Sequence, residues 1–467
     1  MPGLHHLVLP ALLAMALAPG AVAAHATAAP ADATARPRSV ILMIPDGCGP
    51  AAITLARLVS GRALVLDSLL VGAVETHSAD SHVTDSAASG TAYATGVKTR
   101  NWMLGVDPDE RPLGTLLEAA EARGMSTGLV TTADLTDATP AAFVAHVARR
   151  TLQDSIAIEM LEHHVDLLLG GDWQHWRPVT AGGTRLDGRD LFAEHRGRGG
   201  TVVTTPAELA ATRALPLLGL FGTDAIAPDI DRDTLREPSL AQMTAKALEL
   251  LAPSPRGFFV MIEGGRIDDA GHEDDPATVA REVLGYDRAV GLALAFARRD
   301  RHTLVVSVAD HETGGLGLGR RMGRSSPYVM HPESLLTARA SVWRMSDDIL
   351  AGGDPVTVAE RGTGVGLLDD DERTALRAAA TAPDSVRRFG VLRALSEIES
   401  RRARIGWSTG GHTGVDVGLY AWGPGRERFI GLHENTDVAR LIAELLGLDL
   451  DAETTRLRGV AGKAPPR

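Results

Sequence analysis

The chain has 467 residues, of which 44% are hydrophobic and 23% charged, so it is long enough to bury a large core. Its net charge of -12 argues against a nucleic-acid or anionic-membrane partner, and it leaves spare carboxylates, which metal sites use. Because only 4% of the residues are aromatic, the core must be built from Ala, Val, Leu and Ile.

The first 23 residues are typical of a secretory signal peptide. An apolar run, Leu7–Leu17, is followed by an A-x-A cleavage signal at residues 21–23, although the region before the run contains no Lys or Arg. Residues 24–38, rich in Ala, Pro and Thr, are expected to form a flexible lead-in. We therefore predict an exported protein, periplasmic or extracellular, with no transmembrane segment once the signal is removed.

From residue 39 onward, short apolar runs alternate with helical stretches. The expected strands are Ser39–Ile44, Thr127–Thr132, Asp166–Leu169, Thr201–Val203, Phe258–Ile262, Leu304–Val308 and Gly418–Ala421. The expected helices are Leu113–Arg123, Thr278–Arg298 and Asp437–Leu446. This alternation predicts an α/β fold with a mostly parallel central sheet flanked by helices on both faces. Ligands in such folds bind beyond the carboxyl ends of the strands.

One catalytic domain is expected over residues 39–450, followed by a C-terminal tail at 451–467. The alternation breaks at residues 319–405, which we interpret as a cap-like insertion covering part of the site. Two helices are expected in its second half, at Asp370–Thr381 and Ser385–Arg402.

A serine at the head of a helix is the first candidate for chemistry. Within the run Val83–Gly96, Asp85 can cap a helix rich in alanine, and Ser86 follows it directly. Free backbone N–H groups and the positive end of the helix dipole favour a phosphate group at this position. The run alone is also compatible with a capped helix that carries an ordinary exposed serine.

Carboxylates and histidines collect where strands are expected to end. Three expected strands lead directly to such side chains: Asp46, Glu263, and Asp310 with His311. Asp268 and His272 are four residues apart, so one helical turn can direct both at one ion. His412 lies in the motif GGHTG, where glycines allow a close approach of the backbone. Together these fragments predict a metal site at one edge of the sheet.

Six segments, in the same order, resemble those of an alkaline phosphatase. They are Pro45–Gly49, Val83–Thr99, Asp137–Arg150, Ile262–His272, Ala309–Gly315 and Gly410–Gly425. The resemblance is thin across residues 172–255 and across the insertion. It implies hydrolysis of small-molecule phosphate monoesters through a phosphoserine on Ser86, with Arg150 gripping two phosphate oxygens. Family members are often dimers, so a homodimer is a further expectation.

The resemblance also implies a set of metal ligands for two zinc ions and one magnesium ion. It assigns Asp268, His272 and His412 to one zinc; Asp46, Asp310 and His311 to the second; Asp46, Thr139 and Glu263 to magnesium; and Asp137 to magnesium-bound water. Histidine and aspartate suit zinc, whereas the oxygen donors of Thr139 and Glu263 suit magnesium.

Several positions depart from the family pattern, and two of them, Asp269 and Cys48, bear on the chemistry of the site. Asp269 occupies a position at which the family varies, and we expect it to lie near the bound phosphate. It either repels a phosphate dianion, which we favour slightly, or draws magnesium-bound water into place beside Asp137. Cys48, the single cysteine, is more compatible with a small packing residue than with a neighbour of the metal, and it excludes an internal disulfide.

Three other functions compete with this interpretation. A sulfatase would need a C/S-x-P-x-R motif, but Ala87, Ala88 and Ser89 follow Ser86. Phosphodiesterases of the superfamily usually have a threonine nucleophile and lack the magnesium set of Thr139 and Glu263. A phosphate- or metal-binding protein without turnover would need no nucleophile.

Overall fold

A computed structural model describes residues 36–325 and 327–461 of the chain. The expected signal peptide, and the lead-in up to residue 35, lie outside the described residues. Among the described helices, none has both the length and the apolar character that crossing a bilayer requires.

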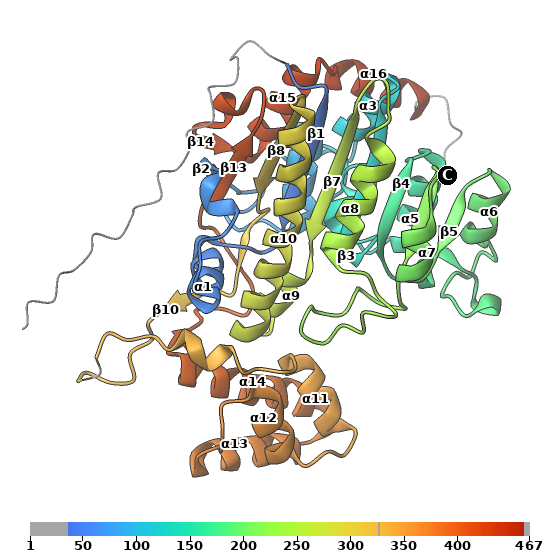
Figure 1. Ribbon diagram of the computed structural model, residues 1–467. Coiled ribbons are helices and arrows are strands. Elements are labelled where there is room, and N and C mark those ends of the chain that lie inside the picture. Colours follow the sequence, from blue (N-terminus) through green and yellow to red (C-terminus); the bar gives the residue numbers. More distant parts are fainter. Residues whose placement is uncertain (1–35, 326, 462–467) are drawn as a thin grey trace, which may run out of the picture.

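Ten strands form one central sheet in the order β14-β2-β13-β8-β1-β7-β3-β4-β6-β5 (Figure 1). Their bounds are β1 Ser39–Pro45, β2 Leu70–Glu75, β3 Ser126–Asp134, β4 Leu167–Gly171, β5 Thr201–Val203, β6 Leu217–Leu220, β7 Phe258–Gly264, β8 Thr303–Val308, β13 Val417–Trp422 and β14 Gly431–Glu434. β13 pairs antiparallel with β2 and β8, and every other neighbouring pair is parallel. The predicted mostly parallel sheet is confirmed.

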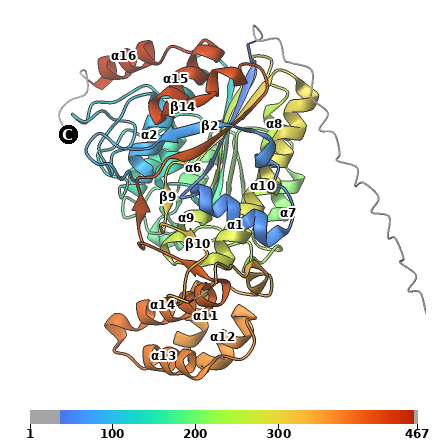
Figure 2. The ribbon, with the colours of Figure 1, turned by 90° about the vertical axis from the view of Figure 1, so that its left-hand side faces the viewer.

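Helices cover both faces of this sheet, as predicted. One face carries α1 (Pro50–Ser60), α8 (Leu240–Leu251) and α10 (Pro276–Asp300), and the other carries α2 (Ser86–Thr95), α3 (Leu116–Ala122) and α15 (Asn435–Leu446) (Figure 2). The remaining helices of the main body are α4 (Ala138–Ala141), α5 (Gln153–Glu162), α6 (Leu191–Gly197), α7 (Pro206–Ala211), α9 (Arg266–His272) and α16 (Leu450–Ala461). The central strand β1 is completely enclosed, since Val40, Ile41, Leu42, Met43 and Ile44 have no exposed surface.

Local capping explains where helix bounds differ from the sequence prediction. The helix expected from Leu113 begins at Leu116, because Thr115 and Glu118 form a capping box. The Thr115 hydroxyl accepts from the Glu118 N–H at 3.1 Å, and the Glu118 carboxylate accepts from the Thr115 N–H at 3.0 Å. α10 begins earlier than expected because Asp275 caps it and Pro276 occupies its first turn.

Four helices of the insertion form a separate layer, drawn in orange below the main body (Figure 1). They are α11 (Val342–Leu350), α12 (Pro355–Thr363), α13 (Asp370–Ala380) and α14 (Asp384–Ala403), and they enclose a hydrophobic cluster of their own. A short antiparallel pair, β10 (Gly317–Leu318) with β11 (Ile405–Gly406), joins the two ends of this layer to the body.

The C-terminal segment is helical through much of its length. α16 packs against α3, and the Gly114 N–H donates to the Thr454 hydroxyl at 2.8 Å. The Arg458 guanidinium donates to Asp107 at 2.8 Å. The described part of the expected tail is therefore bound to the body of the domain.

Candidate functional site

The sheet order brings the predicted site residues together at one edge. β8, β1, β7 and β3 are adjacent and parallel, so their carboxyl ends meet. Asp46 follows β1, Glu263 lies near the end of β7, and Asp310 follows β8. α9, which begins directly after β7, supplies Asp268. His412 is placed by β12 (His412–Thr413), which pairs antiparallel with β9 (Glu312–Thr313).

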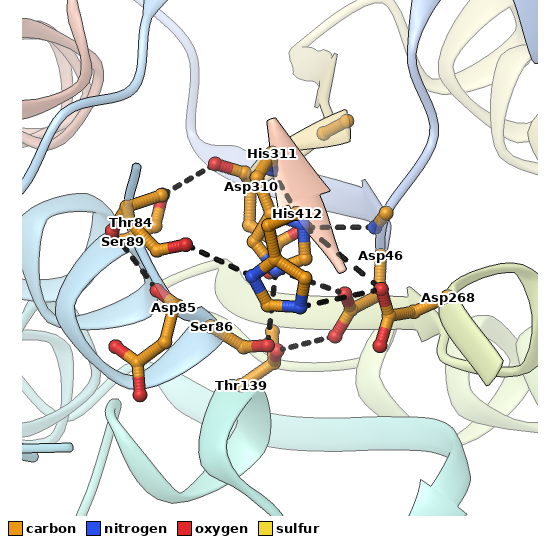
Figure 3. A network of polar contacts seen from close by, with 12 residues as sticks. Asp46, Thr84, Asp85, Ser86, Ser89, Thr139, Asp268, Asp310, His311 and His412 are labelled. Atoms are coloured by element: carbon orange, nitrogen blue, oxygen red, sulfur yellow. Dashed lines mark hydrogen bonds and ion pairs between the residues drawn. The ribbon is translucent and has the colours of Figure 1, made fainter. Parts of the chain in front are cut away.

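Ser86 is the first residue of α2, and its side chain points toward this group of carboxylates and histidines (Figure 3). Asp85 caps the helix by accepting from the Ala88 N–H at 2.9 Å, and its second oxygen accepts from the Trp102 N–H at 2.9 Å. The Ser86 Oγ atom lies 3.2 Å from Nε2 of His311. Ser86 is buried, in contrast to the exposed serine of a simple capped helix.

Asp268, His272 and His412 form the first cluster. His272 Nδ1 lies 2.8 Å from the Gly410 carbonyl and His412 Nδ1 lies 2.9 Å from the Thr84 carbonyl. Since a carbonyl only accepts, each Nδ1 carries the proton. In the neutral rings the two Nε2 lone pairs then face each other, 3.1 Å apart.

The Asp268 carboxylate completes this cluster, with Oδ2 3.2 Å from His272 Nε2 and Oδ1 3.7 Å from His412 Nε2. Lone pairs and an anion at such distances repel unless a proton or a metal cation lies among them, and the Asp268 carboxylate accordingly raises the pKa of His272 to about 9. Two imidazoles and a carboxylate are a donor set that zinc prefers, and histidine ligands commonly donate their other ring N–H to a carbonyl in this way.

Asp46, Asp310 and His311 form the second cluster, which is almost free of solvent contact. His311 Nε2 lies 3.1 Å from Oδ2 of Asp310 and 3.6 Å from Oδ1 of Asp46. Neither of these oxygens accepts a hydrogen bond of good geometry from the described residues. Burial, and repulsion by Asp310, raise the pKa of Asp46 well above its ordinary value. The cluster therefore fits a cation. The ring of His311 also stacks on that of His412 at 3.5 Å, so the two clusters are neighbours.

Thr139 and Glu263 lie on the other side of Asp46. The Thr139 hydroxyl donates to Asp46 Oδ2 at 3.2 Å. One oxygen of Glu263 accepts from the Thr131 hydroxyl, whereas the other has no hydrogen-bond partner among the described residues. Burial raises the pKa of Glu263 to about 8. A hydroxyl and two carboxylates with free oxygens match the oxygen donors that Mg²⁺ prefers.

Arg150 and Asp137 form an ion pair beside the start of α2. Arg150 Nη2 donates to Asp137 Oδ1 at 2.7 Å, and Nη1 lies 3.6 Å from Oδ2 of Asp85. These two carboxylates fix the guanidinium close to the backbone that carries Ser86. A guanidinium in this orientation can bind two oxygens of one phosphate group.

Asp269 and Cys48, which depart from the family pattern, lie in different surroundings. Asp269 is 53% exposed and pairs with Arg266 at 2.8 Å, an ion pair that the sequence analysis did not anticipate. Cys48 is buried within the hydrophobic core, and burial raises the pKa of its thiol. A neutral buried thiol fits the packing role.

The sequence analysis missed several residues that hold the ligands in place. The Thr313 hydroxyl donates to Asp268, the Ser89 hydroxyl donates to the Asp310 carbonyl at 2.9 Å, and the Tyr93 hydroxyl donates to the Ala309 carbonyl at 2.7 Å. Ser89 and Tyr93 lie on α2 behind Ser86, so they attach this helix to the end of β8. No sequence motif marks such contacts, because each joins segments that are far apart along the chain.

Comparisons with known proteins agree with this geometry. The family model described as alkaline phosphatase matches residues 37–448. The repressible alkaline phosphatase of Saccharomyces cerevisiae is 36% identical over 91% of this chain and 84% of its own. The structure of Thermus thermophilus alkaline phosphatase is 33% identical, with a TM-score of 0.81 over 91% of this chain and 96% of that one. A mutant alkaline phosphatase of the Antarctic bacterium TAB5, with Mg bound in the M3 site, is 27% identical, with a TM-score of 0.66 over 89% of this chain and 99% of that one.

The buried acids of the site predict how the stability of the metal-free protein depends on pH. The pKa of Glu263 rises from 4.5 to about 8 on folding, so between these values the folded state holds a proton that the unfolded chain releases. The stability of the chelated protein should therefore fall as the pH rises through the range between these two pKa values, up to about pH 8.

Melting temperatures measured across this range, with chelator and with Zn²⁺ plus Mg²⁺, test the prediction. Bound cations take the place of the protons, so the metal-loaded protein should lose much less stability over the same range. A chelated protein whose melting temperature rises across this window would contradict the assigned protonation.

Proposed function

We propose that this chain, which belongs to the alkaline phosphatase family of phosphate monoester hydrolases, works by transferring the phosphoryl group first to Ser86 and then to water. The observation that carries the proposal is the position of the Ser86 Oγ atom. It is buried at the N-terminus of α2, beside two clusters of potential metal ligands, and lies 3.2 Å from one of their histidines.

The donor sets support two zinc ions and one magnesium ion. Zinc suits the cluster of Asp268, His272 and His412 and the cluster of Asp46, Asp310 and His311, whereas magnesium suits Asp46, Thr139 and Glu263. When bound, these ions would lower the pKa values of the serine hydroxyl and of water, and would offset phosphate charge.

The chain's own residues position the reacting atoms. Ser86 Oγ forms a bond to phosphorus as the bond from phosphorus to the alcohol oxygen breaks, and the alcohol leaves with a proton. Water then attacks the phosphoserine at phosphorus, which releases inorganic phosphate and restores the Ser86 hydroxyl. Backbone N–H groups at the start of α2 and the guanidinium of Arg150 hold the phosphate oxygens throughout.

The carboxylates beside Arg150 hold its side chain in position. Asp85 and Asp137 bind its guanidinium from two sides, which orders the side chain before substrate arrives. Because Asp137 lies close enough to Glu263 to raise its pKa, it is also placed to bind water on a magnesium ion. Thr139, Glu263 and Asp46 lie close together, and this magnesium set favours a monoesterase over a diesterase. The buried nucleophile Ser86 favours an enzyme over a protein that only binds phosphate or metal.

Ser86→Ala should lower kcat by about three orders of magnitude or more, because it removes the atom that accepts the phosphoryl group. Turnover of p-nitrophenyl phosphate and zinc content measure the effect, and zinc content should stay near normal. Ser89→Ala on the same helix is the matched control. It loses one hydrogen bond, worth about 1 kcal/mol of stability, and should keep turnover within about tenfold. Wild-type turnover in Ser86→Ala would remove Ser86 from the mechanism.

Asp269→Lys tests the role of the exposed acid beside the site. If Asp269 repels phosphate, the lysine variant should bind inorganic phosphate several-fold more tightly and show stronger product inhibition. The ion pair with Arg266 weakens this repulsion, so Asp269→Asn is included to separate loss of the acid from gain of a cation. An unchanged phosphate inhibition constant with a raised magnesium requirement would assign Asp269 to the magnesium site instead.

Export, and assembly as a homodimer, belong to the same proposal. The predicted signal peptide at residues 1–23 places the mature N-terminus near Ala24, or after Ala26 if the second A-x-A sequence is used. N-terminal sequencing of the exported enzyme tests the cleavage site. A fully active cytoplasmic protein that still begins at Met1 would contradict export.

A further inference from the structure

Apart from the site at the strand ends, Glu118, His146 and His163 form another cluster of potential metal ligands. Glu118 lies in α3, His146 lies in the loop after α4, and His163 is the residue that ends α5. One ligand atom from each lies within 4.8 Å of the other two. The sequence analysis did not single out any of the three.

The spacing of the ligand atoms fits a tetrahedral metal site. Glu118 Oε1 lies 3.2 Å from His146 Nε2 and 3.6 Å from His163 Nδ1. Metal–ligand bonds of about 2.0–2.1 Å at tetrahedral angles keep ligand atoms about 3.3 Å apart. Two of the three separations therefore match a shared ion, and the third, between the two histidine ligand atoms, is at most 4.8 Å.

Neighbouring groups already fix two of the three ligands in the required orientation. His146 Nδ1 lies 2.8 Å from the Gly105 carbonyl, so this nitrogen donates and Nε2 faces Glu118. His272 and His412 in the catalytic site are oriented by carbonyls in the same way. The capping box holds Glu118 Oε2 against the Thr115 N–H at 3.0 Å, which leaves Oε1 directed at both histidines.

Several other titratable side chains lie around the cluster. Burial, and then repulsion by other acids including Glu118, raise the pKa of Glu121 to about 8 and raise the pKa of Glu159. The guanidinium of Arg456 lies near enough to lower the pKa of His163, but it is paired with Glu453. Glu121 and Glu159 therefore hold protons more readily than free glutamates do, whereas the pKa of Glu118 is lowered, so Glu118 is the ionised carboxylate whose charge a bound divalent ion would offset.

We propose that Glu118, His146 and His163 bind one further divalent transition-metal ion, for which zinc fits best, with water as the fourth ligand. The side chain of His163 is 23% exposed, which gives ion and water access from solvent. The ion would link α3, the loop after α4 and the end of α5. That loop carries Arg150 and follows directly after α4, which carries Thr139, so this second type of metal site would brace the segment that supplies two residues of the proposed catalytic site.

Zinc content of the purified holoenzyme tests the proposal. His163→Phe keeps a ring of similar shape without a ligand nitrogen, and Glu118→Gln keeps a capping-box acceptor without the carboxylate charge. His164→Asn is the matched control, because His164 is the exposed neighbour in a left-handed conformation that asparagine tolerates. After equilibration with Zn²⁺, elemental analysis should give one zinc fewer per chain in the first two variants than in wild type and His164→Asn.

Retained turnover of p-nitrophenyl phosphate in the same samples shows that the catalytic ions are present, so this test is independent of the proposed mechanism. Equal zinc content in active wild type, His163→Phe and Glu118→Gln would overturn the proposal. The cluster would then be a hydrogen-bonded Glu118–His146 pair without a metal. If a variant does not fold, zinc-edge anomalous diffraction from wild-type crystals decides. A peak between Glu118 Oε1 and the two rings supports the site, and its absence overturns it.

Discussion

Asp46, Asp310 and Glu263 lie side by side at the end of the central sheet with almost no contact with solvent. Carboxylates in this position cannot all be ionised unless cations lie among them, because burial removes the hydration that stabilises their charge. Each has an oxygen without a good hydrogen bond from the described residues. The arrangement is therefore unfavourable by itself and becomes favourable when metal ions bind. The fold and the proposed chemistry both depend on bound cations to offset the cost of burying these carboxylates.

The sheet topology brings these carboxylates close together. Adjacent parallel strands β8, β1 and β7 deliver one acid each to the same edge, and the turn after β1 lets α9 approach. Gly47 in that turn has a φ of 70°, and a Cβ atom there would lie 2.6 Å from an oxygen of Asp268. Its N–H donates to Asp310 Oδ1 at 3.0 Å, which holds the two strand ends together. A larger residue at position 47 would force Asp268 away from the cluster.

Much of this arrangement follows from sequence, because strand ends and motif spacing are local signals. The seven expected strands exist, and the acids that follow them meet as the parallel topology requires. Three strands of the central sheet were not predicted. β2 and β14 lie at one edge of the sheet and are mostly exposed or half-buried, and β6 is a short buried run of leucines and glycine. Such runs lack the alternation or length that marks a strand.

Other features depend on contacts between distant segments. One contact that was not predicted is local, because Arg266 and Asp269 pair across a single turn of α9. The Glu118–His146–His163 cluster joins the first turn of α3, the loop after α4 and the end of α5, and it has no sequence motif. The carbonyls that set the tautomers of His272 and His412 belong to residues far away in the sequence. Sequence spacing predicts which side chains can bind a metal, but the tertiary fold decides how each ring is oriented.

The dependence of the site on cations is tested most directly by adding metal back to the chelated enzyme. Phosphate monoester turnover would be measured against the number of zinc ions bound per chain, with Mg²⁺ present. We predict no turnover in the metal-free chain and recovery as the clusters containing Asp268 and Asp46 both fill. A chain shown by elemental analysis to be free of metal, yet hydrolysing phosphate monoesters at the rate of the metal-loaded enzyme, would contradict the account.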